Sequence, residues 1–201
     1  MAGLNFFVYF YLLNAPKMVY NKFGKIYIKM GIELQRKRCG MYIVGENIVH
    51  PLHGAGVIEA IDELKIQGET KLFYVLRIPK GSMTVKIPVA ACDDIGVRRI
   101  VDAEYAERVM NSFKEITVDM TQNWNKRYRE NLLKIRSGDL MEVAGVIKGL
   151  MEREREKGLS NGERKMLRSA KQILISEIVL SQQSSYEEVE RRLNDAFNQE
   201  Y

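Results

Sequence analysis

The chain has 201 residues and a mass of 23.2 kDa, a size that suits one ordinary domain or two small ones. Its composition, 46% hydrophobic and 28% charged residues, excludes a disordered or collagen-like chain. The formal net charge of +5 comes from residues 1–40, which hold seven Lys and Arg residues against one acidic residue. Because residues 41–201 are close to neutral, a nucleic-acid surface in that part requires local clustering of cations.

Residues 1–40 have no clear helical or strand period. The apolar stretch at 4–16 is too short to cross a bilayer, no Lys or Arg precedes it, and no small-residue cleavage site follows it. We expect either a peripheral membrane anchor or an extension upstream of the true start at Met41, and favour the extension, outside the fold. The unpaired Cys39 and Cys92 are typical of a protein from the reducing cytoplasm, where we expect this chain to act.

Residues 41–100 have the pattern of a small β domain. Short runs rich in β-branched and aromatic residues alternate with turn signals at Pro51, Gly54, Gly68 and Pro79. So many short strands in under sixty residues predict a strongly bent SH3-like or Tudor-like barrel. The predicted strands are 42–50, 56–62, 71–78 and 83–89, with 97–101 as a last strand or as the connection out of the barrel.

Residues 101–201 change to a helical period, with one apolar stripe per helix and short loops between helices. This pattern predicts a compact all-α bundle behind the β domain. The predicted N-caps are Asp102, Asn123 and Asp139, followed by capping boxes formed by Ser160 with Glu163 and by Ser185 with Glu188.

A search for catalytic motifs finds no phosphate-binding loop, no dinucleotide fingerprint and no zinc-protease motif. His50 and His53 flank Pro51, and no cysteine or acidic cluster close to them supplies further metal ligands. The adjacent Asp93 and Asp94 are typical of a turn or a helix cap. We therefore expect no enzyme activity, no small-molecule substrate, no cofactor and no metal.

The segment 122–138 concentrates cations around the only tryptophan of the chain, Trp124. Cations beside one aromatic side chain are typical of minor-groove binding, in which the cations contact phosphates and the apolar ring presses on a base step. The alternative is that Trp124 belongs to the buried stripe of its helix and that the cations form its solvated face. The cations of this segment are Lys126, Arg127, Arg129, Lys134 and Arg136, opposed by Glu130 alone.

A second basic group lies in the helix predicted to follow Ser160. Its members are Arg164, Lys165, Arg168 and Lys171, partly offset by Glu163 and Glu177. Taken alone, such a group is more typical of a solvated helix face than of a DNA contact.

Several separated motifs then resemble the CarD/CdnL family of bacterial transcription regulators. The similarity extends in order from Met41 to about Phe197, which also places the family's start at Met41. The motifs are GENIVHPLHGAGVIEAI, then Gly68, MTVKIP at 83–88, NWNKRYRENL and KGLSNGERKML.

This resemblance implies a Tudor-like domain, shared with the transcription-repair coupling factor, that docks on the RNA polymerase β subunit. It also implies a helical domain that contacts promoter DNA, weakly and without sequence preference, at the upstream edge of the melted bubble. Trp124 matches the family's wedge tryptophan, and the expected DNA-facing cations are Lys126, Arg127, Arg129 and Arg164, to which we add the adjacent Lys165.

On the β domain, Lys86 matches a basic position that contacts polymerase in the family. A second such position falls on Leu64, and we expect the adjacent Lys65 to substitute, although a shift of one residue along a strand reverses the face. Backbone pairing at an exposed barrel edge is a further expected route of docking. The resemblance thus implies a non-enzymatic stabiliser of the open promoter complex. The alternative is a scaffolding protein whose helical bundle binds another protein and whose residues 4–13 tether it to a membrane.

Overall fold

Five antiparallel strands form a single sheet in the computed structural model, which describes residues 42–79, 83–118 and 123–198. The strand order is β4-β3-β2-β1-β5. The strands are β1 (Asn47–His50), β2 (Gly54–Ile66), β3 (Glu69–Arg77), β4 (Thr84–Pro88) and β5 (Arg98–Arg99). The predicted strands are confirmed in order, and 97–101 does contain the last strand, which pairs with β1. The predictions for residues 1–40 lie outside the described residues.

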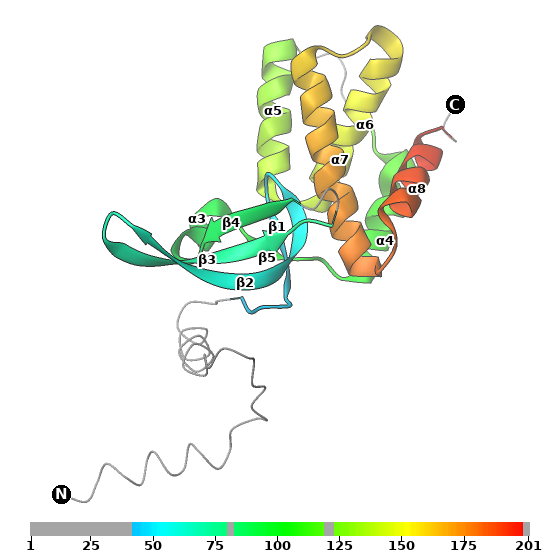
Figure 1. Ribbon diagram of the computed structural model, residues 1–201. Coiled ribbons are helices and arrows are strands. Elements are labelled where there is room, and N and C mark those ends of the chain that lie inside the picture. Colours follow the sequence, from blue (N-terminus) through cyan, green and yellow to red (C-terminus); the bar gives the residue numbers. More distant parts are fainter. Residues whose placement is uncertain (1–41, 80–82, 119–122, 199–201) are drawn as a thin grey trace, which may run out of the picture. The chain divides into compact units, whose positions relative to one another are not determined.

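Two details of the β region differ from the prediction. β2 continues to Ile66, well beyond the predicted end at residue 62, because a two-residue turn pairs Ile66 directly with Glu69. Gln67 and Gly68 both have positive φ angles, 52° and 85°, as a type I′ hairpin turn requires. The resulting hairpin extends away from the helices (Figure 1). A short 3-10 turn, η1 (Val89–Ala91), and a one-turn helix, α3 (Cys92–Ile95), connect β4 to β5 where no helix was predicted.

The helical region follows directly and confirms the predicted change from β to α structure. Its elements are α4 (Ala103–Ser112), η2 (Phe113–Glu115), α5 (Trp124–Ser137), α6 (Leu140–Lys157), α7 (Asn161–Gln182) and α8 (Tyr186–Asn198).

The predicted caps explain where these helices begin. The side chains of Asp102, Asn123 and Asp139 each accept a backbone N–H from the first turn of α4, α5 and α6. Ser160 forms a complete capping box with Glu163 at the start of α7. Before α8, the Ser185 hydroxyl accepts the predicted bond from the backbone N–H of Glu188.

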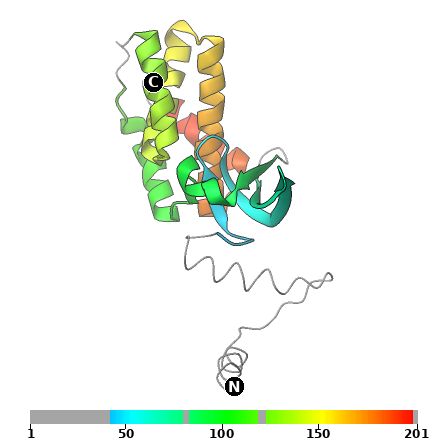
Figure 2. The same cartoon turned by 90° about the vertical axis from the view of Figure 1, so that its left-hand side faces the viewer.

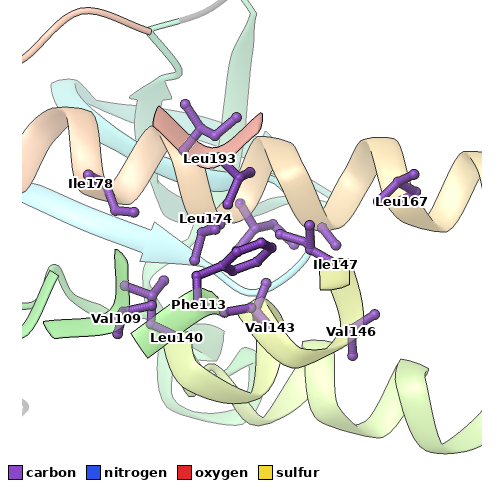
Figure 3. Packing of buried hydrophobic residues seen from close by; sticks show 14 of the residues in the cluster. Val109, Phe113, Leu140, Val143, Val146, Ile147, Leu167, Leu174, Ile178 and Leu193 are labelled. Carbon is purple, nitrogen blue, oxygen red and sulfur yellow. The ribbon is translucent and has the colours of Figure 1, made fainter. Parts of the chain in front are cut away.

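The core of the helical region surrounds Phe113, whose side chain is fully buried. Figure 3 shows its ring among Leu140 and Val143 of this core on one side and Leu174 and Leu193 on the other. These side chains come from α6, α7 and α8. Helix α7 packs against both α6 and α8 and has buried residues along most of its length. The predicted apolar stripes are therefore the packed faces of the bundle.

The sheet and the helices pack against one another, and Ile43–Tyr201 forms one compact unit. Figure 2, like Figure 1, shows the helices grouped on one side of the sheet. At the junction the backbone N–H of Ala55 donates to the Oγ atom of Ser176 over 2.8 Å. Gly54, at φ 89°, allows this approach, because a Cβ atom there would lie 2.4 Å from the same Oγ atom.

A buried ion pair strengthens the junction. The guanidinium of Arg98 in β5 donates to both carboxylate oxygens of Glu177 in α7, over 2.5 and 2.9 Å. It also donates to the carbonyl oxygen of Gly138 at the end of α5, over 2.6 Å from Nη2 and 3.0 Å from Nε. Glu177 is fully buried and accepts a further bond from the backbone N–H of Val101. One side chain of the sheet thus holds two helices.

Candidate nucleic-acid and protein interfaces

Trp124 is exposed at the N-terminal end of α5. Asn123 caps the helix at this point, and 42% of the Trp124 surface remains accessible. Its ring stacks on that of Tyr128, one turn later, with 5.2 Å between centroids and 21° between planes. Further along the helix the stripe turns inward, so that Ile135 is buried. Trp124 is therefore the first residue of the apolar stripe, and it extends beyond the bundle rather than into the core.

The first turn of α7 supports this aromatic pair. Gly162 lies against Tyr128, because a Cβ atom at Gly162 would be 3.7 Å from Cε2 of the tyrosine ring. The exposed Arg164 and Lys165 follow in the same stretch of α7. Two basic groups that are forty residues apart in the sequence are thus brought to the same end of the bundle. This end is remote from the sheet, because α5 reaches β5 only through its opposite end at Gly138 (Figure 1).

Lys126 and Arg129 carry the outward charge of α5. Both are exposed, and they line an open hollow together with Asn123, Asn125 and Glu130. The Lys126 ammonium lies 3.8 Å from the Glu130 carboxylate, and two-thirds of the lysine side chain is accessible. An exposed pair of this kind is weak, so the lysine remains available to an anionic ligand.

Arg127, expected with the DNA-facing cations, differs from them in being turned inward. Only 9% of Arg127 is exposed, and its Nη2 atom donates to Oε1 of Glu163 over 3.0 Å. The physical reason is helix geometry: Arg127 projects toward α7, whereas Lys126 and Arg129, one and two residues away, project to solvent. Counting charges along the sequence could not separate these faces.

Glu163 is the centre of this buried polar group. It is 3% exposed and accepts hydrogen bonds from the backbone N–H and the hydroxyl of Ser160, over 3.0 and 2.8 Å. Nε of Arg153, on α6, lies 3.2 Å from its Oε1 atom. Burial alone would raise the pKa of Glu163, but the bonds from Ser160 and Arg127 and the Arg153 charge outweigh it and hold that pKa below its usual range.

The other cations of the basic segments have structural partners or lie apart. Lys134 pairs with Glu142 of α6 over 3.3 Å, and the half-buried Lys171 donates to Asn194 of α8 over 3.1 Å. Arg136 lies exposed near the opposite end of α5 from Trp124.

Lys86 is exposed on β4, an edge strand of the sheet. Its ammonium reaches across β3 to Asp62 of β2, with 2.9 Å between Nζ and Oδ2. In the registers Val75↔Lys86 and Asp62↔Phe73, all four side chains lie on one face of the sheet.

The same register assigns a face to each of the other lysines of the hairpin. Leu64 pairs with Lys71, so both lie on the face of Lys86. Lys65 pairs with Thr70 and lies on the opposite face, so it cannot take the place of Leu64 beside Lys86. Lys71, half exposed and directly opposite Leu64, is a cation on this face that the sequence analysis did not single out. The two-residue turn at Gln67 and Gly68 sets the register of these hairpin residues.

Within residues 42–79, 83–118 and 123–198, no cluster of histidine, cysteine and acidic side chains could hold a metal ion. In the same part of the chain, no helix has both the length and the apolar character needed to cross a membrane.

Comparison with known proteins matches both parts of the chain. Residues 42–101 match the family described as "CarD-like/TRCF RID domain", and residues 108–194 match "CarD, C-terminal domain". The chain is 38% identical over 138 residues to "Putative transcription factor YdeB" of Bacillus subtilis (strain 168), which covers 69% of this chain and 90% of that protein. Together with the β-then-α fold, these matches show that the chain belongs to the CarD/CdnL family of transcription regulators.

Proposed function

We propose that this chain is a non-enzymatic transcription regulator that binds the β subunit of RNA polymerase and stabilises the open promoter complex. The observation that carries the proposal is Trp124, 42% exposed and stacked on Tyr128 at the end of a helix whose outward cations flank it. A large apolar ring kept outside the core, beside cations, is suited to an opened base step.

The DNA side of the proposal requires few phosphate contacts. Lys126, Arg129, Arg164 and Lys165 are exposed at the Trp124 end of the bundle. A small number of cations gives weak binding with a shallow dependence on salt. DNA affinity must therefore be supplemented by a tether, which polymerase would provide by raising the local concentration of the protein at the promoter.

The polymerase side is the β4 edge with the sheet face that carries Lys86. An edge strand presents backbone N–H and C=O groups to which an extended segment of a partner can add. Lys86 and Lys71 lie on one face close to that edge, with Phe73 and Val75 half buried between them. This face offers a partner two exposed lysines around an apolar centre, each paired with an acidic side chain that a carboxylate of the partner could replace: Lys86 with Asp62 and Lys71 with Glu69.

Stabilisation of the open complex follows from a difference in affinity. A protein bound to polymerase shifts promoter opening only as far as it binds the open form better than the closed form. In the proposed arrangement that difference comes from Trp124, because a paired and stacked duplex offers its ring no unstacked base step.

The test is the lifetime of open complexes of RNA polymerase holoenzyme on a linear promoter after addition of a competitor. The wild-type chain should lengthen this lifetime, and Trp124→Ala should lose that effect while still binding core polymerase. Lys86→Glu should bind core polymerase less well and lose the effect for that reason. A wild-type chain that binds polymerase but leaves the lifetime unchanged would refute the proposal.

A further inference from the structure

Three helix ends meet at Glu163. Its carboxylate is 3% exposed and takes Arg127 from α5 and Arg153 from α6, while it closes the capping box of its own helix, α7. We propose that Arg127 and Glu163 are a positioning pair that presents Trp124 to DNA, and that Arg127 itself does not contact phosphate. This inference rests on the proposed function and adds to it the residues that orient the tryptophan.

The path from the pair to the tryptophan is short. Arg127 is three residues after Trp124, and Tyr128, on which Trp124 stacks, is the next residue. Tyr128 in turn lies against Gly162, the residue before Glu163. The arginine and the tyrosine therefore hold the first turn of α5 against the first turn of α7 at two adjacent points. Within the described residues, the stack on Tyr128 is the aromatic contact that fixes the direction of the Trp124 ring.

The burial of Arg127 and its pairing with Glu163 favour a positioning role over a DNA contact. The Arg127 side chain is 11% exposed, so its charge is taken up by a buried carboxylate. To reach a phosphate, Arg127 would have to leave its partly enclosed position and break its charge-assisted hydrogen bond to Glu163. Lys126 and Arg129 reach solvent from the same helix turns without such a cost.

The pair can be broken without leaving Glu163 unsatisfied. In the absence of the Arg127 guanidinium, Ser160 still donates two hydrogen bonds to the carboxylate and Arg153 still lies 3.2 Å from it. We therefore expect Arg127→Met to remain folded, since its aliphatic side chain fills much of the same volume. Glu163→Gln offers a second way to weaken the pair, with the size of the side chain unchanged.

Salt dependence distinguishes positioning from phosphate contact. The quantity to measure is the ratio of open-complex lifetimes with and without the protein, at several salt concentrations. On a plot of log affinity against log salt concentration, each lost phosphate contact reduces the steepness of the slope by about 0.9. We expect Lys126→Met to flatten the dependence in this way. Arg127→Met and Glu163→Gln should each lower the ratio roughly fivefold at every salt concentration, with the slope unchanged and the double variant no worse than either single variant.

A second readout uses the free protein and does not depend on DNA or polymerase. Trp124 is the only tryptophan, so fluorescence excited at a wavelength that tyrosine does not absorb reports on this position alone. Arg127→Met and Glu163→Gln should increase acrylamide quenching of Trp124 and lower its anisotropy. Arg108→Met, which breaks an exposed ion pair with Glu104 on α4, should change neither and serves as the matched control.

The inference is overturned if Arg127→Met flattens the salt dependence as Lys126→Met does, or if both pair variants leave Trp124 fluorescence and the lifetime ratio at wild-type values. Failure of the proposed function looks different. In that case Trp124→Ala and Lys126→Met leave open complexes unaffected, while fluorescence of the free protein still decides whether the pair holds the tryptophan.

Discussion

Replacement of Trp124 by alanine separates a role in the fold from a role at DNA. Truncation of a fully buried tryptophan costs about 3–5 kcal/mol of folding stability. Trp124 is 42% exposed, and its ring stacks on that of Tyr128. Such a stack contributes about 0.5–1.5 kcal/mol beyond burial. We therefore expect Trp124→Ala to lose about 1–2 kcal/mol, well below the cost of a core tryptophan.

The same substitution should have a larger effect on the lifetime of the open promoter complex than on folding. An aromatic ring stacked on a base contributes about 1–3 kcal/mol, which corresponds to a roughly 5- to 150-fold change in complex lifetime. Thermal unfolding measures the first quantity, with a shift of a few degrees expected for a chain of this size. Competitor-challenged open complexes measure the second. Trp124→Phe, which keeps a smaller ring, should give an intermediate lifetime.

Two results would refute this reasoning. A loss of about 4 kcal/mol or more on unfolding of Trp124→Ala would mean that the ring is part of the core. A natively folded Trp124→Ala protein that prolongs open complexes as well as wild type would mean that the exposed ring has no role in opening.

Three further predictions concern the sheet and its junction with the helices. Lys71→Glu should weaken binding to core polymerase as Lys86→Glu does, whereas Lys65→Glu, on the opposite face, should not; equal effects of all three in a pull-down or titration would contradict the assigned face. Burial and a neighbouring histidine lower the pKa of His50 from 6.5 to about 4, so the unfolded chain binds an extra proton between these values. Stability should therefore be full above about pH 6.5 and fall as the pH decreases toward 4, and His50→Gln should flatten this part of a urea-denaturation profile. Gly54→Ala should lose more than about 2 kcal/mol on chemical unfolding, because its positive φ and the 2.4 Å approach to α7 both disfavour a Cβ atom, and an unchanged midpoint would show that the junction tolerates it.

The fold was predictable because its signals are local. An N-cap acts within one turn of its own helix, so Asp102, Asn123 and Asp139 could be assigned from sequence alone. The pairings of β1 with β2, β2 with β3 and β3 with β4 join neighbours in sequence, whereas β5 returns to pair with β1 and completes the order by a contact between distant segments. The length of β2 was underestimated, because its last residues are held by a turn whose geometry a glycine permits but does not by itself reveal.

The candidate site was less predictable because it depends on which way each side chain points, and composition does not reveal this. The sequence grouped Arg127 with its charged neighbours, but the structure turns it inward. Its partner Glu163 lies 36 residues away and was recognisable only as half of a capping box. The face on which Lys71 and Lys65 lie was likewise not readable from the sequence, since the face of a strand residue depends on a register set elsewhere.

The Arg98–Glu177 ion pair has a consequence for how the chain can be divided. Glu177 is fully buried with the sheet in place and takes hydrogen bonds from Arg98 and from the Val101 backbone, so a fragment that begins at α4 would lose both partners. A hydrogen bond to a charged group contributes about 1.5–3 kcal/mol, a large share of the stability of a domain this size. The sheet and the bundle should therefore melt in a single calorimetric transition. A chimera that takes each half from a different relative should be more stable where the parents supply both this arginine and this glutamate than where either is missing.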